Sequence, residues 1–170
     1  PLTSDGTVAE ENYHDIFTRG GRAALRLEAG DNWSITPAIM AQKQDSYGNF
    51  ASDDTIGEYK VAKFYPESAH DAWMQASLTI EGKIGNFDVT YAFAHLNRDL
   101  ETQFDYSDYS YWYDTLASSG AYFYDNAGNI VNPSQIILGD DEYEKNSHEL
   151  RIASPGDQPV RFVAGLFWQE

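Results

Sequence analysis

The sequence predicts an all-β protein whose antiparallel hairpins form part of a large transmembrane β-barrel, and three observations favour this fold class. Apolar and polar residues alternate with a period of two over several stretches, which is typical of strands with one apolar face. Short turns join the predicted strands at one end and long polar segments join them at the other, as in outer-membrane barrels. The predicted strands also have about the 9 to 11 residues that cross a bilayer when tilted.

The first predicted hairpin joins a strand at about residues 21–29 to a strand at about 33–44. The residues "GDN" between them have the chemistry of a tight turn. Alternate positions of both strands are apolar, and the intervening positions are mostly polar or small. The predicted apolar face consists of Ala23, Leu25, Leu27, Ala29, Trp33, Ile35, Pro37, Ile39 and Ala41.

Two further hairpins repeat the pattern, the second at about 72–83 and 87–98 around "KIGN" and the third at about 146–154 and 160–169 around "SPGDQP". The segments between hairpins, at about 45–71 and 99–145, are long and polar, and they are the predicted extracellular loops. The apolar positions are Met74, Ala76, Leu78, Ile80, Phe87, Val89, Tyr91 and Phe93, then His148, Leu150, Ile152, Val160, Phe162, Ala164, Leu166 and Trp168.

A soluble antiparallel sandwich would show the same alternation, because its strands also have one buried face. Three features favour a lipid-facing sheet. The polar face carries charges in mid-strand, the apolar face has Trp33, Phe87 and Trp168 near strand ends like an aromatic girdle, and the connections differ sharply in length between the two ends.

Composition excludes several other classes of protein. The formal charge of −16 argues against nucleic acid or an anionic membrane surface as a partner that is reached by simple attraction. Cysteine is absent, which removes disulfides, thiol chemistry and cysteine-based zinc sites. With 42% hydrophobic residues the chain is not disordered by composition, and no run reaches the roughly 18 apolar residues of a membrane helix.

Three quoted segments carry a resemblance to a known family: "GGRAALR", "TIEGKIGNFDVTY" and "ELRIASP". Over about residues 12 to 170 the chain resembles TonB-dependent outer-membrane receptors, in particular the broad proteobacterial group rich in sphingomonad-type members. The resemblance implies a barrel of about 22 strands with an N-terminal plug domain. It also implies import of a nutrient, such as an iron chelate, cobalamin or a carbohydrate, across the outer membrane of a Gram-negative bacterium.

The partners that this resemblance implies are outer-membrane lipid, the nutrient and the TonB complex, which acts through the plug domain. Neither a plug domain nor a TonB-contacting segment is recognisable here, so we expect the chain to be a middle portion of the barrel. The polar strand faces would then line the lumen. The predicted lumen-facing residues are Arg22, Arg26, Glu28, Gln42, Gln75, Glu81, Arg98, Glu149 and Arg151.

The segment "FDYSDYSYWYD" at 104–114 combines six aromatic residues with three aspartates. If a strand continued through it, Tyr109, Tyr111 and Tyr113 would share one face and Trp112 the other. One hypothesis is a ligand-capture surface, since such rings offer rigid apolar area with polar tips. The other is a rim in which the rings pack between hairpins. The candidate ligand-binding residues are Asp105, Tyr106, Asp108, Tyr109, Tyr111, Trp112, Tyr113 and Asp114.

No catalytic constellation is apparent, so we expect neither an enzyme nor a cofactor or metal site. The four histidines are scattered without ligand spacing, and paired acids such as Asp53 and Asp54 are typical of solvated loops. "DNAGN" at 125–129 is predicted to be a turn. The alternative function is a soluble carbohydrate-binding β-sandwich that uses Tyr109, Tyr111, Trp112 and Tyr113 as an aromatic platform.

Overall fold

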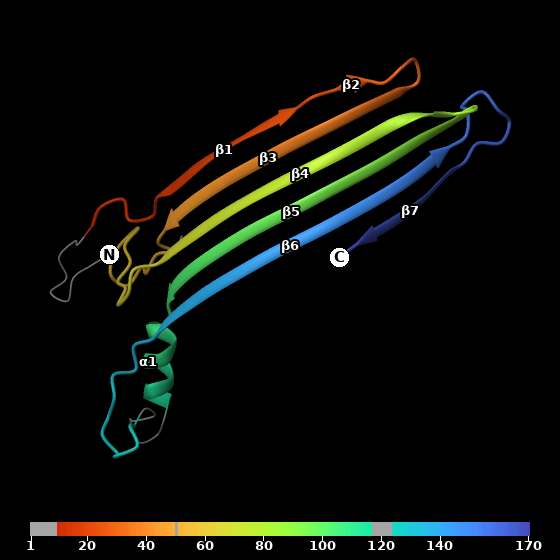
Figure 1. The fold of residues 1–170 in the computed structure, drawn as a ribbon. Helices are drawn as coiled ribbons and strands as arrows, with labels where there is room; N and C mark the ends of the chain where they lie inside the picture. Colours follow the sequence, from red (N-terminus) through yellow and green to blue (C-terminus); the bar gives the residue numbers. More distant parts are fainter. Residues whose placement is uncertain (1–9, 50, 117–123) are drawn as a thin grey trace. The chain divides into compact units, whose positions relative to one another are not determined.

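A computed structural model describes residues 10–49, 51–116 and 124–170, apart from the side chains of 114–116. It confirms the all-β prediction, because the described residues form one antiparallel sheet with a single short helix. The sheet is open, with the order β1-β3-β4-β5-β6-β7 and with β2 paired to β3 (Figure 1). The elements are β1 (Ile16–Ala24), β2 (Leu27–Glu28), β3 (Trp33–Tyr47), β4 (Ser68–Ile84), β5 (Phe87–Asp105), α1 (Ser107–Leu116), β6 (Ile136–Ala153) and β7 (Val163–Gln169).

Four strands are longer than the sequence predicts, with 15 residues in β3, 17 in β4, 19 in β5 and 18 in β6. They extend into the segments 45–71 and 99–145 that were expected to be loops. In these extensions apolar and polar residues no longer alternate regularly, so the sequence does not predict a half-buried strand there. The backbone ladder does not depend on that alternation, because its hydrogen bonds join main-chain groups.

The first predicted strand is interrupted at Leu25 and Arg26, between β1 and β2. Opposite this break lies Pro37, whose carbonyl accepts a hydrogen bond from Leu25 N at 3.0 Å. A proline has no N–H to return the second bond of that pair, so the ladder is weakened at this point. The interruption is therefore a direct consequence of one residue on β3.

The turn between β4 and β5 consists of Gly85 and Asn86, and Gly85 has a φ of 60°. Glycine adopts this positive φ without steric penalty, and glycine at the first central position is typical of a type II′ hairpin turn. The third hairpin turns over a longer segment than predicted, because β7 begins at Val163 and not at residue 160. Phe162 nevertheless stays in register, since its carbonyl accepts the backbone N–H of Ser154 at 3.0 Å.

The segment 107–116 is an α-helix, which corrects the expectation of an extended strand or irregular loop. Asp105 Oδ1 accepts the N–H of Ser107 at 3.0 Å, and Asp108 lies in the first turn, where its charge favours the helix N-terminus. Among the described residues, no helix is long and apolar enough to cross a membrane.

The chain divides into two compact units, and the long strands contribute residues to both. Unit 1 contains residues 1–17, 44–70 and 100–141, which include α1. Unit 2 contains residues 18–43, 71–99 and 142–170, which include the three hairpin turns and all of β2 and β7.

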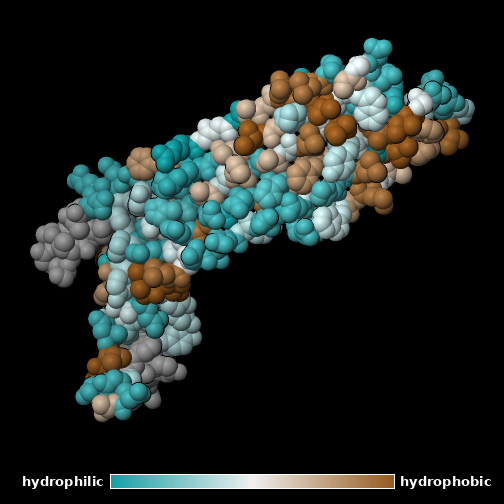
Figure 2. Space-filling model, viewed as in Figure 1, coloured by the Kyte–Doolittle hydropathy of each residue, from teal (hydrophilic) through white to brown (hydrophobic). Residues whose placement is uncertain are grey.

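The two faces of unit 2 follow the predicted alternation. Leu27 pairs with Ile35 and Leu150 with Leu166, whereas Glu28 pairs with Ser34 and Arg151 with Gly165. Paired residues of an antiparallel ladder lie on the same face, so the apolar and polar positions segregate. We name the first face the apolar face and the second the polar face. Figure 2 shows apolar side chains gathered over the strands near the short turns.

Burial of apolar side chains is slight within the described residues. Val61, at 7% exposure, is the one buried hydrophobic residue among them. Leu166, Phe167 and many other large apolar side chains are exposed. A soluble sandwich would bury one face of each sheet against a second sheet. The described strands provide a single sheet, so they do not supply that second layer.

Candidate functional site

The polar face of unit 2 contains the residues that were predicted to face a lumen. Arg26 Nε lies 2.8 Å from Glu28 Oε1, and its Nη1 lies 3.5 Å from Glu81 Oε2. On β6 the guanidinium of Arg151 contacts Glu149, with Nε at 3.0 Å from Oε1. These side chains are largely exposed, so solvent screens each pair and its contribution to stability is small. Arg22, Gln42 and Gln75 occupy positions of the same face on β1, β3 and β4.

Arg98 forms the best-oriented ion pair of the polar face, and its partner was not selected from the sequence. Its Nε donates a hydrogen bond to Asp71 Oδ1 and its Nη2 donates one to Asp71 Oδ2, each at 2.7 Å. Asp71 lies at an odd position of β4, as Gln75 and Glu81 do, and that parity is the sequence signal that would have found it. The bidentate geometry fixes both side chains more firmly than a single contact does.

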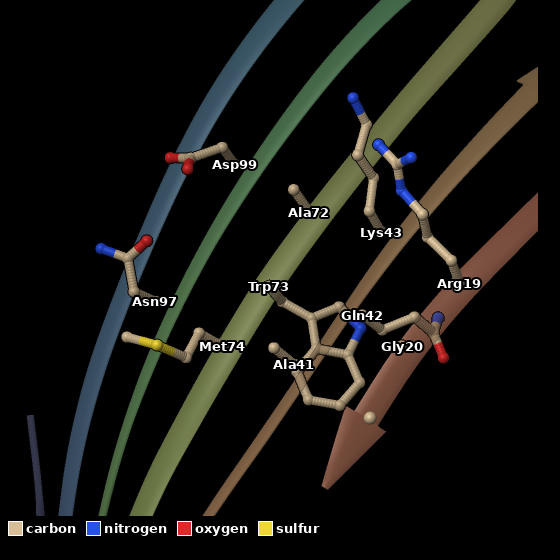
Figure 3. Close-up of a pocket in the computed structure, with 11 residues that line it drawn as sticks. Arg19, Gly20, Ala41, Gln42, Lys43, Ala72, Trp73, Met74, Asn97 and Asp99 are labelled. Carbon is tan, nitrogen blue, oxygen red and sulfur yellow. The ribbon is translucent and has the colours of Figure 1, made fainter.

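The apolar face of unit 2 has a hollow of about 550 Å³ near the end of its strands that lies away from the short turns. Gly21, Ala41 and Ala72 form a floor of small residues, and Arg19, Lys43 and Asp99 lie around it. Figure 3 shows the Arg19 and Lys43 side chains on the neighbouring strands β1 and β3, with Asp99 on β5. No sequence pattern indicates this hollow, because its residues are spread over four strands.

In unit 1 the helix α1 and the residue before it carry four aromatic side chains, which we name the aromatic helix face: Tyr106, Tyr109, Trp112 and Tyr113. The ring centroid of Tyr109 lies 4.7 Å from that of Tyr106, 4.5 Å from that of Tyr113 and 6.3 Å from that of Trp112. Spacings of three and four residues bring side chains together on a helix. Tyr109 and Tyr113 lie together as expected, but the expected grouping was wrong for Tyr111, which stacks on Phe64, and for Trp112, which lies beside Tyr109. The expectation assumed the period of a strand.

Two serines hold the opposite side of α1 in place. Ser107 is 0% exposed and Ser110 is 2% exposed. Ser107 Oγ accepts the N–H of Gln135 at 3.1 Å, and Ser110 Oγ donates to Gln135 Oε1 at 2.8 Å. Small hydroxyl side chains at i and i+3 thus let the helix approach the segment before β6 closely, which leaves the aromatic rings on the other side.

Tyr111 packs away from the aromatic helix face. Its ring stacks on Phe64 with centroids 5.0 Å apart and an interplanar angle of 21°, and its hydroxyl donates to Asn132 Oδ1 at 3.1 Å. Tyr111 therefore contacts two loop segments of unit 1. By contrast, Tyr109 is 46% exposed and Trp112 is 55% exposed.

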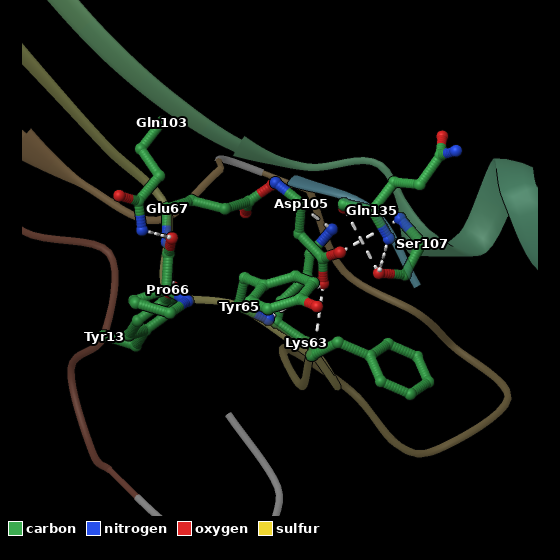
Figure 4. A network of polar contacts seen from close by, with 10 residues as sticks. Tyr13, Lys63, Tyr65, Pro66, Glu67, Gln103, Asp105, Ser107 and Gln135 are labelled. Atoms are coloured by element: carbon green, nitrogen blue, oxygen red, sulfur yellow. Dashed lines mark hydrogen bonds and ion pairs between the residues drawn. The ribbon is translucent and has the colours of Figure 1, made fainter. Parts of the chain in front are cut away.

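Asp105 joins β5 to the loop that carries Phe64 (Figure 4). Its Oδ2 accepts the N–H of Phe64 at 2.7 Å and that of Tyr65 at 3.4 Å, and its Oδ1 accepts the N–H of Ser107. Partial desolvation opposes ionisation, but the hydrogen bonds from Ser107, Phe64 and Tyr65 outweigh it and lower the pKa of the carboxyl. Asp105 is thus a structural acceptor here. Asp108 is exposed, and the side chain of Asp114 lies outside the described residues.

Tyr109 titrates differently from an ordinary tyrosine. Hydrogen bonding with Tyr113, together with desolvation and the charge that Tyr113 and Tyr106 would acquire, raises the pKa of Tyr109 to about 12. The neutral hydroxyl is therefore retained at every physiological pH. A neutral phenol can both donate and accept hydrogen bonds at the edge of a stacking ring.

Glu67 directly precedes β4, and its side chain is buried, with 3% exposure. Its Oε1 lies 3.5 Å from Lys63 Nζ, and its backbone N–H donates to the Tyr13 hydroxyl at 2.8 Å. Gln103 Nε2 donates to the carbonyl of Pro66 at 2.7 Å (Figure 4). These contacts hold the loop before β4 against β5, and none of these residues was selected from the sequence.

Among the described residues, no three His, Asp or Glu side chains are placed to hold a metal ion. The segment at 125–129 forms the predicted turn, in which Asp125 accepts the N–H groups of Ala127 and Asn129 at 2.9 and 2.8 Å. The side-chain amide of Asn129, which donates to Asp125 Oδ2 at 2.8 Å, is the main cause of a lowered pKa of Asp125, and the backbone bonds from Asn129 and Ala127 add to it.

The chain was compared with protein-family models, curated proteins and solved structures, and no significant match was found.

Proposed function

We propose that this chain is part of the wall of an outer-membrane transporter, which captures a nutrient and imports it with energy supplied through TonB. One observation carries the proposal: unit 2 is a single antiparallel layer in which most large apolar strand side chains lie on one face and many of them are exposed, although Phe167 pairs with Glu149 on the polar face. Leu150 and Leu166 are paired on that face, while Arg151 and Gly165 are paired on the other. An exposed apolar face opposite a charged face is what a barrel strand needs between lipid and an aqueous lumen.

The open sheet supports a larger closed assembly. The outward edges of β1 and β7 have no neighbouring strand among the described residues. In lipid each unsatisfied backbone group costs several kcal/mol, so a membrane-embedded sheet must be closed by further strands. The resemblance of "GGRAALR", "TIEGKIGNFDVTY" and "ELRIASP" to TonB-dependent receptors supports a barrel of about 22 strands in a Gram-negative outer membrane.

Spin labels on the intact protein test the membrane orientation. Single cysteines at 148–152 on β6 are labelled in reconstituted bilayers, and collision rates with oxygen and with a water-soluble nickel complex are measured. Labels at Leu150 and Ile152 should collide mainly with oxygen, and labels at Glu149 and Arg151 mainly with nickel. Equal exposure of neighbouring positions to the nickel complex would exclude a lipid-facing sheet.

Transport is tested separately in cells. Uptake of labelled iron chelates, cobalamin and oligosaccharides is measured with and without the gene for the intact protein and with and without TonB. Uptake of one class should require both. Uptake that persists without TonB would contradict the energy source, whereas the spin-label result would still decide the membrane location.

We further propose that the aromatic helix face takes part in ligand capture. Tyr109 and Trp112 present exposed rings with polar tips, which suits stacking on a sugar or on the aromatic part of a chelate. Tyr111 serves as the matched control, because its ring already packs on Phe64. Alanine at Tyr109 or Trp112 should raise the half-saturation concentration for uptake at least about fivefold, the loss expected of an interface hot spot. Uptake unchanged in both variants would assign the rings to rim packing.

A further inference from the structure

The aromatic helix face belongs to a negatively charged part of the chain. From Asp99 to Glu144 the sequence has ten acidic residues and neither lysine nor arginine. Unit 1, which contains α1, has two lysines, Lys60 and Lys63, and no arginine. Lys63 is already paired with Glu67, with 3.5 Å between Nζ and Oε1. The field of these carboxylates attracts cations to unit 1 and repels anions, and the formal charge of −16 on the whole chain acts in the same direction.

The two carboxylates at the start of α1 keep their negative charge. Asp105 accepts its hydrogen bonds from neutral backbone N–H groups, which leave the charge in place. Asp108 is exposed and lies in the first turn of the helix. It precedes Trp112 by four residues, and side chains at this spacing are neighbours on a helix. A negative charge therefore lies at the border of the aromatic helix face.

Tyr109 is the centre of the ring cluster. Its centroid lies 4.7 Å from that of Tyr106, with the two planes tilted by 45°, and 6.3 Å from that of Trp112. Tyr106 is 39% exposed, and Tyr109 and Trp112 are exposed to a greater extent, so a dissolved ligand can reach all three rings. The face of an aromatic ring attracts a cation that lies within about 6 Å of the ring centroid. Rings this close to one another can therefore share one cation.

From this arrangement we infer that the aromatic helix face binds an organic ammonium group, with the ring faces of Tyr109 and Trp112 contacting the cation and Asp108 supplying the opposite charge. The inference deepens the proposed role of this face in ligand capture and rests on it. It narrows the nutrient to an amine-bearing molecule, either an iron chelate with a free amine or an amino sugar. An anionic chelate would be repelled by the surrounding carboxylates, and a neutral sugar would gain nothing from them.

Two probes of equal shape separate the charge from the apolar contact. Choline carries a trimethylammonium group, and 3,3-dimethylbutanol carries a neutral tert-butyl group in its place. The intact protein is labelled with 5-fluorotryptophan, and the fluorine signal of Trp112 is assigned by its loss in Trp112→Phe. The shift of this signal gives the dissociation constant at the aromatic helix face. Choline should bind about two- to fivefold more tightly than the alcohol, and equal dissociation constants would overturn the inference.

Three variants assign the preference to the rings. Tyr109→Ala should abolish it, whereas Tyr109→Phe keeps a ring and should retain most of it. Tyr59→Ala removes another exposed ring of unit 1, in the loop before β4, and should leave the preference unchanged. A preference that survives in Tyr109→Ala would overturn the inference, and so would an equal loss in Tyr59→Ala.

Asp108→Asn tests the charge at the border of the face. It should weaken the binding of choline about twofold and leave that of 3,3-dimethylbutanol unchanged, because the alcohol has no charge to attract. An unchanged affinity for choline would overturn the role of Asp108. The alcohol also serves as the folding control, since its dissociation constant changes if the substitution disturbs the helix.

Uptake by cells that carry the intact protein distinguishes the two sources of the amine. A glucosamine oligosaccharide and an iron hydroxamate chelate with a free amine are each compared with the N-acetylated form, which has lost the positive charge. The free amine of one pair should be taken up in preference, and Tyr109→Ala should remove this preference. Uptake that needs Tyr109 but is equal for free and acetylated forms overturns this inference alone. Uptake of both forms that is unchanged in Tyr109→Ala overturns ligand capture by the rings.

Discussion

Tyr111 and Phe64 stack with their ring centroids 5.0 Å apart, and this pair ties the helix α1 to the loop that precedes β4. A double-mutant cycle with Phe64→Ala and Tyr111→Ala should give a coupling energy of about 0.5–1.5 kcal/mol. The measurement is the opening free energy of α1 from amide hydrogen exchange in the intact protein. Tyr109→Ala paired with Phe64→Ala provides the control, and the two should be additive. A coupling energy near zero for Tyr111 would contradict a packing role.

Ser110 should tolerate enlargement poorly, because its side chain is buried against Gln135. Ser110→Val removes the donor to Gln135 Oε1 and should destabilise the docked helix by about 1–3 kcal/mol. Amide exchange of residues 108–113 measures the effect. Ser52→Val, at an exposed serine of unit 1, should leave that exchange unchanged. Equal exchange in both variants would mean that α1 does not depend on this contact.

Asp105 should make the junction between β5 and α1 sensitive to acid. Its folded pKa is lowered, so its contribution to stability is present above the unfolded value of 3.8 and is lost as the pH falls through the lower folded pKa. Amide protection at Phe64 and Ser107 should be constant above that value and decline below it. In Asp105→Asn the protection should be weaker and should lose this acid dependence. The same acid decline in Asp105→Asn would assign it to another group.

Tyr109 should ionise only in strongly alkaline solution. Its pKa is raised to about 12, so its contribution to stability is present below the ordinary value of 10.0 and is lost as the pH rises through the folded pKa. Titration of the tyrosinate absorbance should show one step near pH 12 that Tyr109→Phe removes. Tyr124→Phe should leave that step intact. A wild-type titration that ends near the ordinary value would contradict the hydrogen bonding between Tyr109 and Tyr113.

Gly82 should resist substitution, because the indole of Trp33 occupies the space where a Cβ would be built. Gly82→Ala must displace that ring, and overpacking of this kind costs about 1–3 kcal/mol. The lower stability should appear as a lower temperature at which the folded, heat-modifiable form of the protein disappears. Gly21→Ala is the matched strand control, since a Cβ there meets nothing within 4 Å. Equal melting of the two variants would show that Trp33 repacks freely.

Much of unit 2 could be predicted from the sequence. The apolar face of Leu27, Ile35, Leu150 and Leu166 follows from alternation, since a period of two assigns each residue to a face before any partner is known. The short turns follow from glycine chemistry, as at Gly85. The break at Leu25 also has a cause in the sequence, because Pro37 lies opposite it. This cause can be recognised only when the register of β1 and β3 is known.

Unit 1 was less predictable because its signals compete. In "FDYSDYSYWYD" a strand reading groups Tyr109 with Tyr111, whereas the serine spacing of three residues favours a helix. Aromatic residues and serine have only moderate helix propensity, so the local sequence does not decide between them. The burial of Ser107 and Ser110 against Gln135, which comes 25 residues after Ser110, decides the outcome.

The sequence by itself determined the antiparallel strands, the face on which each side chain lies and the acidic, aromatic character of the segment around α1. The tertiary structure decided the helix, the partner of Arg98 and the hollow that Arg19, Lys43 and Asp99 line. Strand periodicity is a local property of consecutive residues. Cross-strand register and helix docking depend on contacts between distant residues, and those contacts form only when the chain folds.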